Sequence, residues 1–185
     1  SFQPMGREAF PVAAGGNSLA ESPAQRLWLA ANFSEAIPDW SVGTTRILPG
    51  PDQRLGFCGE VPQQTDEPSY VGVAFAAPSG GPLAELPPGS RIAADVWLDP
   101  GTSRPLTVQL WDLDAGQNFQ IFLPDLPRGC WFSIHVPIAD LRPVFPERAH
   151  GPLRRPRALM FAVAGDKAGQ LWVTRARLLA PPMTP

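Results

Sequence analysis

Hydrophobic and polar residues alternate along four short runs in the middle of the chain, between residues 89 and 137. The runs cover residues 91–98, 106–111, 118–123 and 131–136, and turn-forming sequence separates them. In each run, one set of alternate positions is aliphatic or phenylalanine, and the other carries tryptophan, phenylalanine and polar side chains. Successive side chains of a β-strand point to opposite faces. Each run therefore predicts a strand with one face in a core and a polar-aromatic face outside it.

Further strands are predicted on both sides of these runs, at residues 26–33, 41–48, 54–59, 69–77, 157–164 and 170–179. With 17 glycines and 24 prolines in 185 residues, long helices are disfavoured and many short strands joined by turns are favoured. The segment 139–156 is too rich in proline for a continuous strand, although one helical turn fits near Asp140. We predict an all-β fold, a two-sheet antiparallel β-sandwich in which the first and last strands are neighbours.

The length of the chain predicts one domain. Residues 1–25 are expected to form a linker or an arm, residues 26–180 the β-sandwich, and residues 181–185 a tail. A net charge of −2 predicts no attraction to nucleic acid, and no apolar run is long enough for membrane insertion. Cys58 and Cys130 are the only cysteines, and both two buried thiols and a disulfide are compatible with their positions.

The polar-aromatic faces predict carbohydrate binding, because aromatic rings stack on the apolar faces of sugars and planar polar groups pair with hydroxyls. Trp97 and Trp111 are the candidate platforms, with Phe122 or Trp131 beside them. If the four runs are neighbours in one sheet, the candidates share one surface. In the alternative interpretation, the amino-terminal arm or a loop covers this face and the tryptophans only pack. The predicted carbohydrate-binding residues are Asp95, Trp97, Gln109, Trp111, Gln120, Phe122 and His135.

No motif for catalysis or metal binding appears in the sequence. His135 and His150, the only histidines, do not have the spacing of metal ligands. Asp95, Asp99 and Asp112 could supply paired carboxylates for glycoside hydrolysis, but no pattern requires the raised pKa that such a pair needs. Asp112 also lies beside a turn, where aspartate commonly bonds to the backbone. We therefore assign no catalytic residue and no metal ligand.

Three features in order along the chain resemble the galactose-binding-like jelly rolls. They are a strand ending in Phe33 and followed by Trp40, the phrase WFSIHVPIADL at 131–141, and a final strand of the type LWVxxAxL at 171–178. This group includes carbohydrate-binding modules attached to glycoside hydrolases and the complex-I intermediate-associated type of domain. The resemblance covers about residues 26–179 and implies a jelly-roll sandwich.

The chain departs from this group at a structural calcium site that many of its members hold. Ser34 and Thr174 stand where the resemblance implies acidic ligands, although Glu35 and Asp39 are nearby. Calcium requires several oxygen ligands, usually including carboxylates. We therefore expect no cofactor and disfavour a structural calcium.

These observations predict a non-catalytic carbohydrate-binding module that recognises a polysaccharide or oligosaccharide. The resemblance implies a glycan ligand, an extracytoplasmic location (secreted or periplasmic) and a catalytic domain linked in a larger protein. Two alternatives remain open. One is a small polysaccharide lyase or hydrolase that uses the same face, and the other is a protein-interaction or assembly domain.

Overall fold

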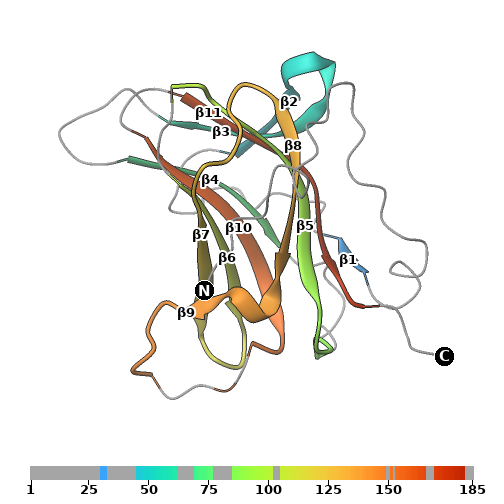
Figure 1. Ribbon diagram of the computed structural model, residues 1–185, viewed down its shortest axis with the longest axis vertical. Coiled ribbons are helices and arrows are strands. Elements are labelled where there is room, and N and C mark those ends of the chain that lie inside the picture. The colour runs from blue at the N-terminus through green and yellow to red at the C-terminus, as the bar shows by residue number, and fades with distance from the viewer. Residues whose placement is uncertain are drawn as a thin grey trace.

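The computed structural model describes residues 30–32, 45–61, 69–76, 85–101, 105–148, 151, 153–165 and 169–181. These residues form two antiparallel sheets that lie in two layers (Figure 1). The predicted two-sheet antiparallel sandwich is confirmed. The predicted arm at residues 1–25 lies outside the described residues.

The first sheet has the strand order β2-β3-β11-β5-β8, and β1 also pairs with β11. Its strands are β1 (Ala30–Asn32), β2 (Thr45–Pro49), β3 (Leu55–Val61), β5 (Arg91–Leu98), β8 (Trp131–Pro137) and β11 (Gly169–Leu179). The second sheet has the order β4-β10-β6-β7-β9. Its strands are β4 (Ser69–Ala76), β6 (Leu106–Asp112), β7 (Gln117–Leu123), β9 (Arg142–Pro143) and β10 (Pro156–Gly165).

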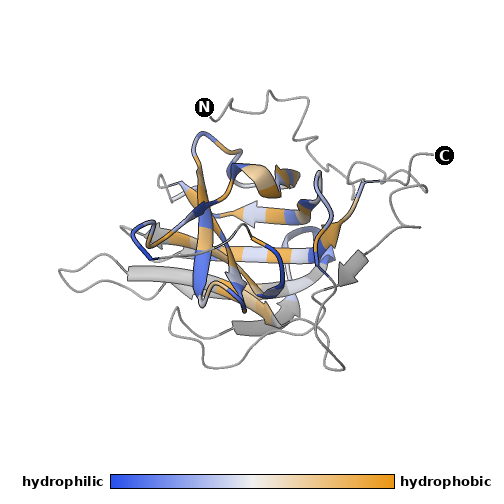
Figure 2. Cartoon of the chain, turned by 90° about the horizontal axis from the view of Figure 1, so that it is seen from below, coloured by the Kyte–Doolittle hydropathy of each residue, from blue (hydrophilic) through white to orange (hydrophobic). Residues whose placement is uncertain are grey.

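The core between the sheets consists of the aliphatic and phenylalanine positions that the alternation predicted. Figure 2 shows hydrophobic and hydrophilic residues alternating along the described strands. All the predicted inward positions of the four central strands are at most 8% exposed. In the neighbouring strands, the Phe161 ring of β10 contacts the Phe75 ring of β4 edge-on, with the ring centroids 6.2 Å apart. The central positions are Ile92, Ala94, Val96, Leu98, Leu106, Val108, Leu110, Phe119, Ile121, Leu123, Phe132, Ile134 and Val136.

The turns and strand ends also follow the predicted pattern. Residues 113–116 join β6 to β7 in a hairpin, with Gly116 at φ 60°, a left-handed conformation that glycine adopts without strain. The short helix η3 (Ile138–Asp140) is the predicted helical turn. Ala30 of β1 lies opposite Leu179 of β11, which confirms that the first and last strands are neighbours.

The two cysteines are free thiols, which decides between the two possibilities left open by the sequence. Cys58 is buried in β3, whereas Cys130 lies just before β8. Partial burial raises the pKa of the Cys130 thiol, so it is less nucleophilic at neutral pH than an exposed cysteine.

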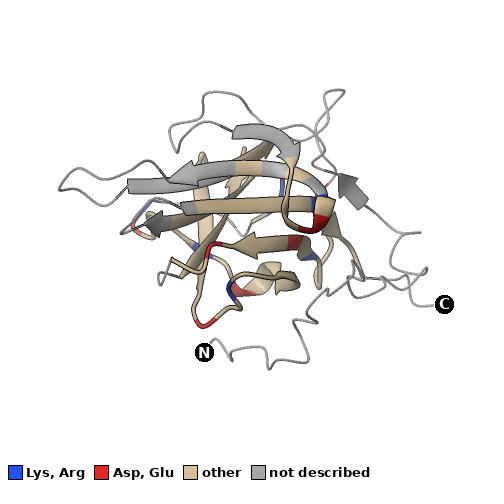
Figure 3. Cartoon of the chain, turned by 90° about the horizontal axis from the view of Figure 1, so that it is seen from above, with Lys and Arg blue, Asp and Glu red and all other residues tan. Residues whose placement is uncertain are grey.

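The described surface has few charges along its strands. Figure 3 shows Lys, Arg, Asp and Glu mostly at strand ends and in loops. No helix in the described part of the chain is long and apolar enough to cross a membrane.

Candidate functional site

The seven predicted binding residues do not share one surface, because the four central strands are not neighbours in one sheet. Asp95, Trp97 and His135 belong to β5 and β8 in the first sheet, whereas the other four belong to β6 and β7 in the second sheet. The chain crosses between the layers after β5 and again after β7. The two groups therefore lie on opposite outer faces of the sandwich. The four in the second sheet are Gln109, Trp111, Gln120 and Phe122.

The outer face of the first sheet carries a row of three tryptophans, which we call the tryptophan row. Trp97 of β5 lies opposite Trp131 of β8 on one side and Trp172 of β11 on the other. Trp131 is 1% exposed and Trp172 is 5% exposed, and Cys58 of β3 packs beside them. The sequence interpretation missed Trp172, although its parity along the last run places it outside the core.

The tip of the β2–β3 hairpin covers this row. The tip contains the short helix η2 (Pro51–Gln53), and the Trp131 indole Nε1 donates a hydrogen bond to the Pro51 carbonyl at 2.9 Å. The guanidinium of Arg54 lies 4.9 Å from the centroid of the Trp131 ring. Gly50 is packed so closely that a Cβ there would lie 3.2 Å from Trp172. Trp131 and Trp172 therefore pack within the protein, as the covered-face alternative expected, but the cover that the structure describes is the hairpin tip.

Asp95 is also engaged within the protein. Its side chain is 1% exposed, and Ser133 Oγ donates to its Oδ1 at 2.6 Å. Arg54 Nη1 and Arg175 Nη1 lie 3.5 Å and 3.7 Å from its Oδ2. Arg175 reaches this position from a bulge in β11, where its φ is 54°. A buried carboxylate compensated in this way is not available to a ligand. His135 lies half-buried on the same face.

The outer face of the second sheet brings the other four candidates together. We call the outward residues of β6 and β7 the glutamine face. Gln109 and Gln120 are direct cross-strand partners, and Gln109 Nε2 donates to Gln120 Oε1 at 2.9 Å. Phe122 is 55% exposed, and Trp111 is half-buried. The face consists of Thr107, Gln109, Trp111, Asn118, Gln120 and Phe122, and none of these side chains is ionisable.

The register of the hairpin places the aromatic rings at opposite ends of the glutamine face. Trp111 lies opposite Asn118, and Phe122 lies opposite Thr107, with the glutamine pair between them. A strand rises about 3.4 Å per residue, so the two aromatic positions are roughly 14 Å apart. One sugar ring cannot contact both, whereas an oligosaccharide lying along the strands can.

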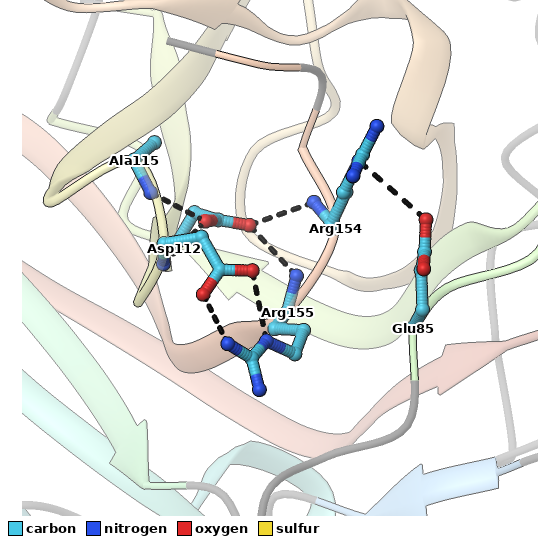
Figure 4. A network of polar contacts seen from close by, with 6 residues as sticks. Glu85, Asp112, Ala115, Arg154 and Arg155 are labelled. Carbon is cyan, nitrogen blue, oxygen red and sulfur yellow. Dashed lines mark hydrogen bonds and ion pairs between the residues drawn. The ribbon is translucent and has the colours of Figure 1, made fainter.

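Asp112 joins two distant parts of the chain (Figure 4). Its side chain is fully buried, and Oδ1 accepts the backbone N–H groups of Asp114 and Ala115, both at 2.9 Å. Oδ2 accepts those of Arg154 and Arg155 at 2.7 Å and 2.8 Å. The predicted turn interaction is present, but the second pair of bonds reaches residues that the sequence did not connect to Asp112. Four N–H donors occupy this carboxylate, which gives it a structural role.

The Arg155 guanidinium forms two contacts with the Asp114 carboxylate beside this network. The hydrogen bond from Arg155 lowers the pKa of Asp114, and the positive charges of Arg155 and Arg154 act in the same direction. Both side chains are exposed, so this pair contributes little to stability.

No group of three or more His, Cys, Asp or Glu side chains in the described ranges is arranged to hold a metal ion. Thr174, where the resemblance implies an acid, lies opposite Asp95. Ser34, Glu35 and Asp39 lie outside the described residues. The expectation that calcium is disfavoured stays a prediction.

Comparison with known proteins supports the fold. No protein-family model matches the chain, and no curated protein matches it. Among solved structures, a family 30 carbohydrate-binding module matches with a TM-score of 0.58 and 8% identity, covering 83% of this chain and 99% of that one. A family 11 carbohydrate-binding module from Clostridium thermocellum, in complex with a β-1,3-1,4-mixed-linked tetrasaccharide, matches with a TM-score of 0.54 and 15% identity, covering 91% and 95%. The chain therefore has the jelly-roll sandwich fold of carbohydrate-binding modules.

Proposed function

We propose that this protein is a non-catalytic carbohydrate-binding module that binds a polysaccharide or oligosaccharide on the glutamine face. The observation that carries the proposal is the Gln109–Gln120 amide pair placed between Trp111 and Phe122 on one outer surface. The chain shares its fold with carbohydrate-binding modules, and this likeness supports the proposed function. The fold alone does not identify the ligand.

The chemistry of this face suits a glycan. Each glutamine amide offers both donors and an acceptor, so the pair can bond to hydroxyl groups while keeping its mutual hydrogen bond. Trp111 and Phe122 supply apolar rings for stacking at either end. Because these rings are far apart, a ligand of several units gains contacts that a monosaccharide lacks.

Binding fits this face better than hydrolysis does. Glycoside hydrolysis ordinarily requires two carboxylates beside the scissile bond. The outward positions of β6 and β7 carry none, and the buried carboxylates of Asp95 and Asp112 are held by hydrogen bonds and ion pairs. This comparison favours the binding module over the small polysaccharide-active enzyme.

The proposal extends to the setting of the protein. We propose an extracytoplasmic location, secreted or periplasmic, and a catalytic domain that is linked to this module in a larger protein. Cell fractionation of the full-length polypeptide tests the first point, and the sequence of that polypeptide tests the second.

The test of binding is calorimetry with soluble oligosaccharides, including a β-1,3-1,4-mixed-linked tetrasaccharide. We expect Trp111→Ala to weaken binding by about 1–3 kcal/mol, because it removes a stacking platform. Trp97→Ala is the matched control, since it makes the same substitution on the opposite sheet and should leave the affinity unchanged.

Equal weakening by both variants, or by neither, would move the site away from the glutamine face. If no glycan from the panel binds the wild-type protein, the protein-interaction function becomes the better explanation of this surface.

A further inference from the structure

A cavity of about 550 Å³ opens at one end of the sandwich, and we call it the end cavity. The segment before β5, the segment around η3 and β9, and residues 153–154 surround it. Phe119 of β7 lines it from the core side and has the opposite parity to Gln120, whereas Arg142 of β9, which also lines it, is the cross-strand partner of Gln120, so the cavity borders the glutamine face. Its volume falls within the range of small-molecule sites.

Hydrogen bonds between loops hold the walls of the end cavity in place. Leu86 N donates to the Arg154 carbonyl at 2.9 Å, and Ile138 N donates to the Ser90 carbonyl at 3.0 Å. Ser90 Oγ donates to the Pro87 carbonyl at 2.6 Å. Asp112 fixes the Arg154 backbone from behind. A ligand would therefore enter a cavity that is already formed and would not have to order its walls.

The floor of the end cavity is apolar. Phe119 and Leu141 are each 4% exposed, and the partly buried Leu86, Ile138 and Leu153 complete the lining. The described lining residues include no asparagine, glutamine, threonine or tyrosine. Hydrogen-bonding side chains occur only in the rest of the lining, at Glu85, Ser90, Arg142 and Arg154, so the floor itself fits a hydrocarbon or aromatic group better than the hydroxyls of a sugar.

The rim of the end cavity carries a net positive charge. Arg154 Nε lies 3.5 Å from Glu85 Oε1, so the charges of these two side chains offset each other. Arg142 is the remaining charged side chain among the described lining residues, and its Nη1 donates to the Ala139 carbonyl at 2.6 Å and to the Leu141 carbonyl at 3.1 Å. A guanidinium has five N–H donors, so one anchored through Nη1 keeps others for a carboxylate.

We infer that the end cavity binds a small organic carboxylate with an apolar body, with the body on the Phe119 and Leu141 floor and the carboxylate at Arg142. The preformed apolar floor would contact the apolar body of the ligand, and the positive charge at the rim would attract its carboxylate. This site differs from the proposed glycan site in its ligand chemistry and in its residues, although Arg142 at its rim is the cross-strand partner of Gln120.

Titration of the whole protein by calorimetry or NMR with cinnamate tests this inference, and cinnamamide serves as its uncharged counterpart. We expect cinnamate to bind more tightly than cinnamamide. Arg142→Gln should weaken cinnamate binding about tenfold and leave cinnamamide binding nearly unchanged, because only the charge-assisted hydrogen bonds are lost.

Two further variants keep the test decisive if Arg142→Gln lowers stability. Glu85→Gln changes an exposed side chain and removes the negative charge from the rim, so it should tighten cinnamate binding about twofold to threefold. Arg148→Gln is the control, because Arg148 stacks over Phe145 and does not line the cavity. The inference is overturned if cinnamate does not bind, if cinnamamide binds equally well, or if Glu85→Gln and Arg148→Gln have the same effect on cinnamate binding.

Discussion

Single residues of this protein act mainly through the hydrogen bonds that they make when buried, and Asp112 is the strongest example. One carboxylate satisfies two donors in the β6–β7 turn and two donors in the segment 154–155. The segment 154–155 in turn supplies part of the wall and rim of the end cavity. The local and the long-range structure at this end therefore depend on the same side chain.

We predict that Asp112→Asn destabilises the protein by about 2–5 kcal/mol, because the amide nitrogen cannot accept the donors that one carboxylate oxygen now satisfies. Urea unfolding measures the loss. Asp114→Asn provides a control two residues away with the same change in charge, and breaking its exposed pair should cost much less stability than the change at Asp112. Similar losses in the two variants would contradict the structural role of Asp112.

Among the elements, the β2–β3 hairpin has a role beyond pairing in the sheet, because its tip shields the tryptophan row. Trp131 is held by a hydrogen bond to Pro51, and Gly50 fits against the Trp131 and Trp172 rings. The hairpin turns a surface of large aromatic rings into a small second core outside the sandwich. Without it, this sheet would present an apolar patch to solvent.

Gly50→Ala tests this packing, because the new Cβ would lie 3.0 Å from the Arg54 carbonyl, 3.2 Å from the Trp172 ring and 3.3 Å from the Trp131 ring. We expect a loss of about 1–3 kcal/mol, the usual cost of overpacking. Tryptophan fluorescence should shift to longer wavelength as the rings gain contact with water. Gly151→Ala is the control, since no atom of the described residues beyond its chain neighbours lies within 4 Å of the new Cβ there. An unchanged spectrum and stability in Gly50→Ala would show that the tip is not packed on the row.

At the scale of the whole molecule, the packing of the two sheets on each other is the main source of stability. The carboxylate of Asp95, next to Thr174 in the neighbouring strand, is compensated by arginine side chains and a serine hydroxyl. The core between the layers is a continuous set of buried apolar side chains.

We therefore expect that removal of divalent ions with a chelator leaves the melting temperature nearly unchanged. Differential scanning calorimetry with and without chelator makes the measurement. A marked fall in melting temperature that added calcium restores would show that other oxygen atoms form a calcium site.

The sequence by itself determined the class of fold, the positions of most strands and the side of each of the four central strands that faces the core. For example, Val96 and Trp97 were assigned to opposite faces correctly, because the period of two is a property of the local backbone. The same local pattern identified the chemistry of the outward positions, including the Gln109 and Gln120 amides.

Only the tertiary structure decided which strands share a sheet. Trp97 and Trp111 have the same outward parity in consecutive strands, yet they lie on opposite faces of the molecule because the chain crosses between the layers after β5. Backbone pairing between distant segments determines sheet membership, and alternation carries no information about it. For the same reason, the sequence could not connect Asp112 with Arg154, or place Phe119 and Arg142 around one cavity.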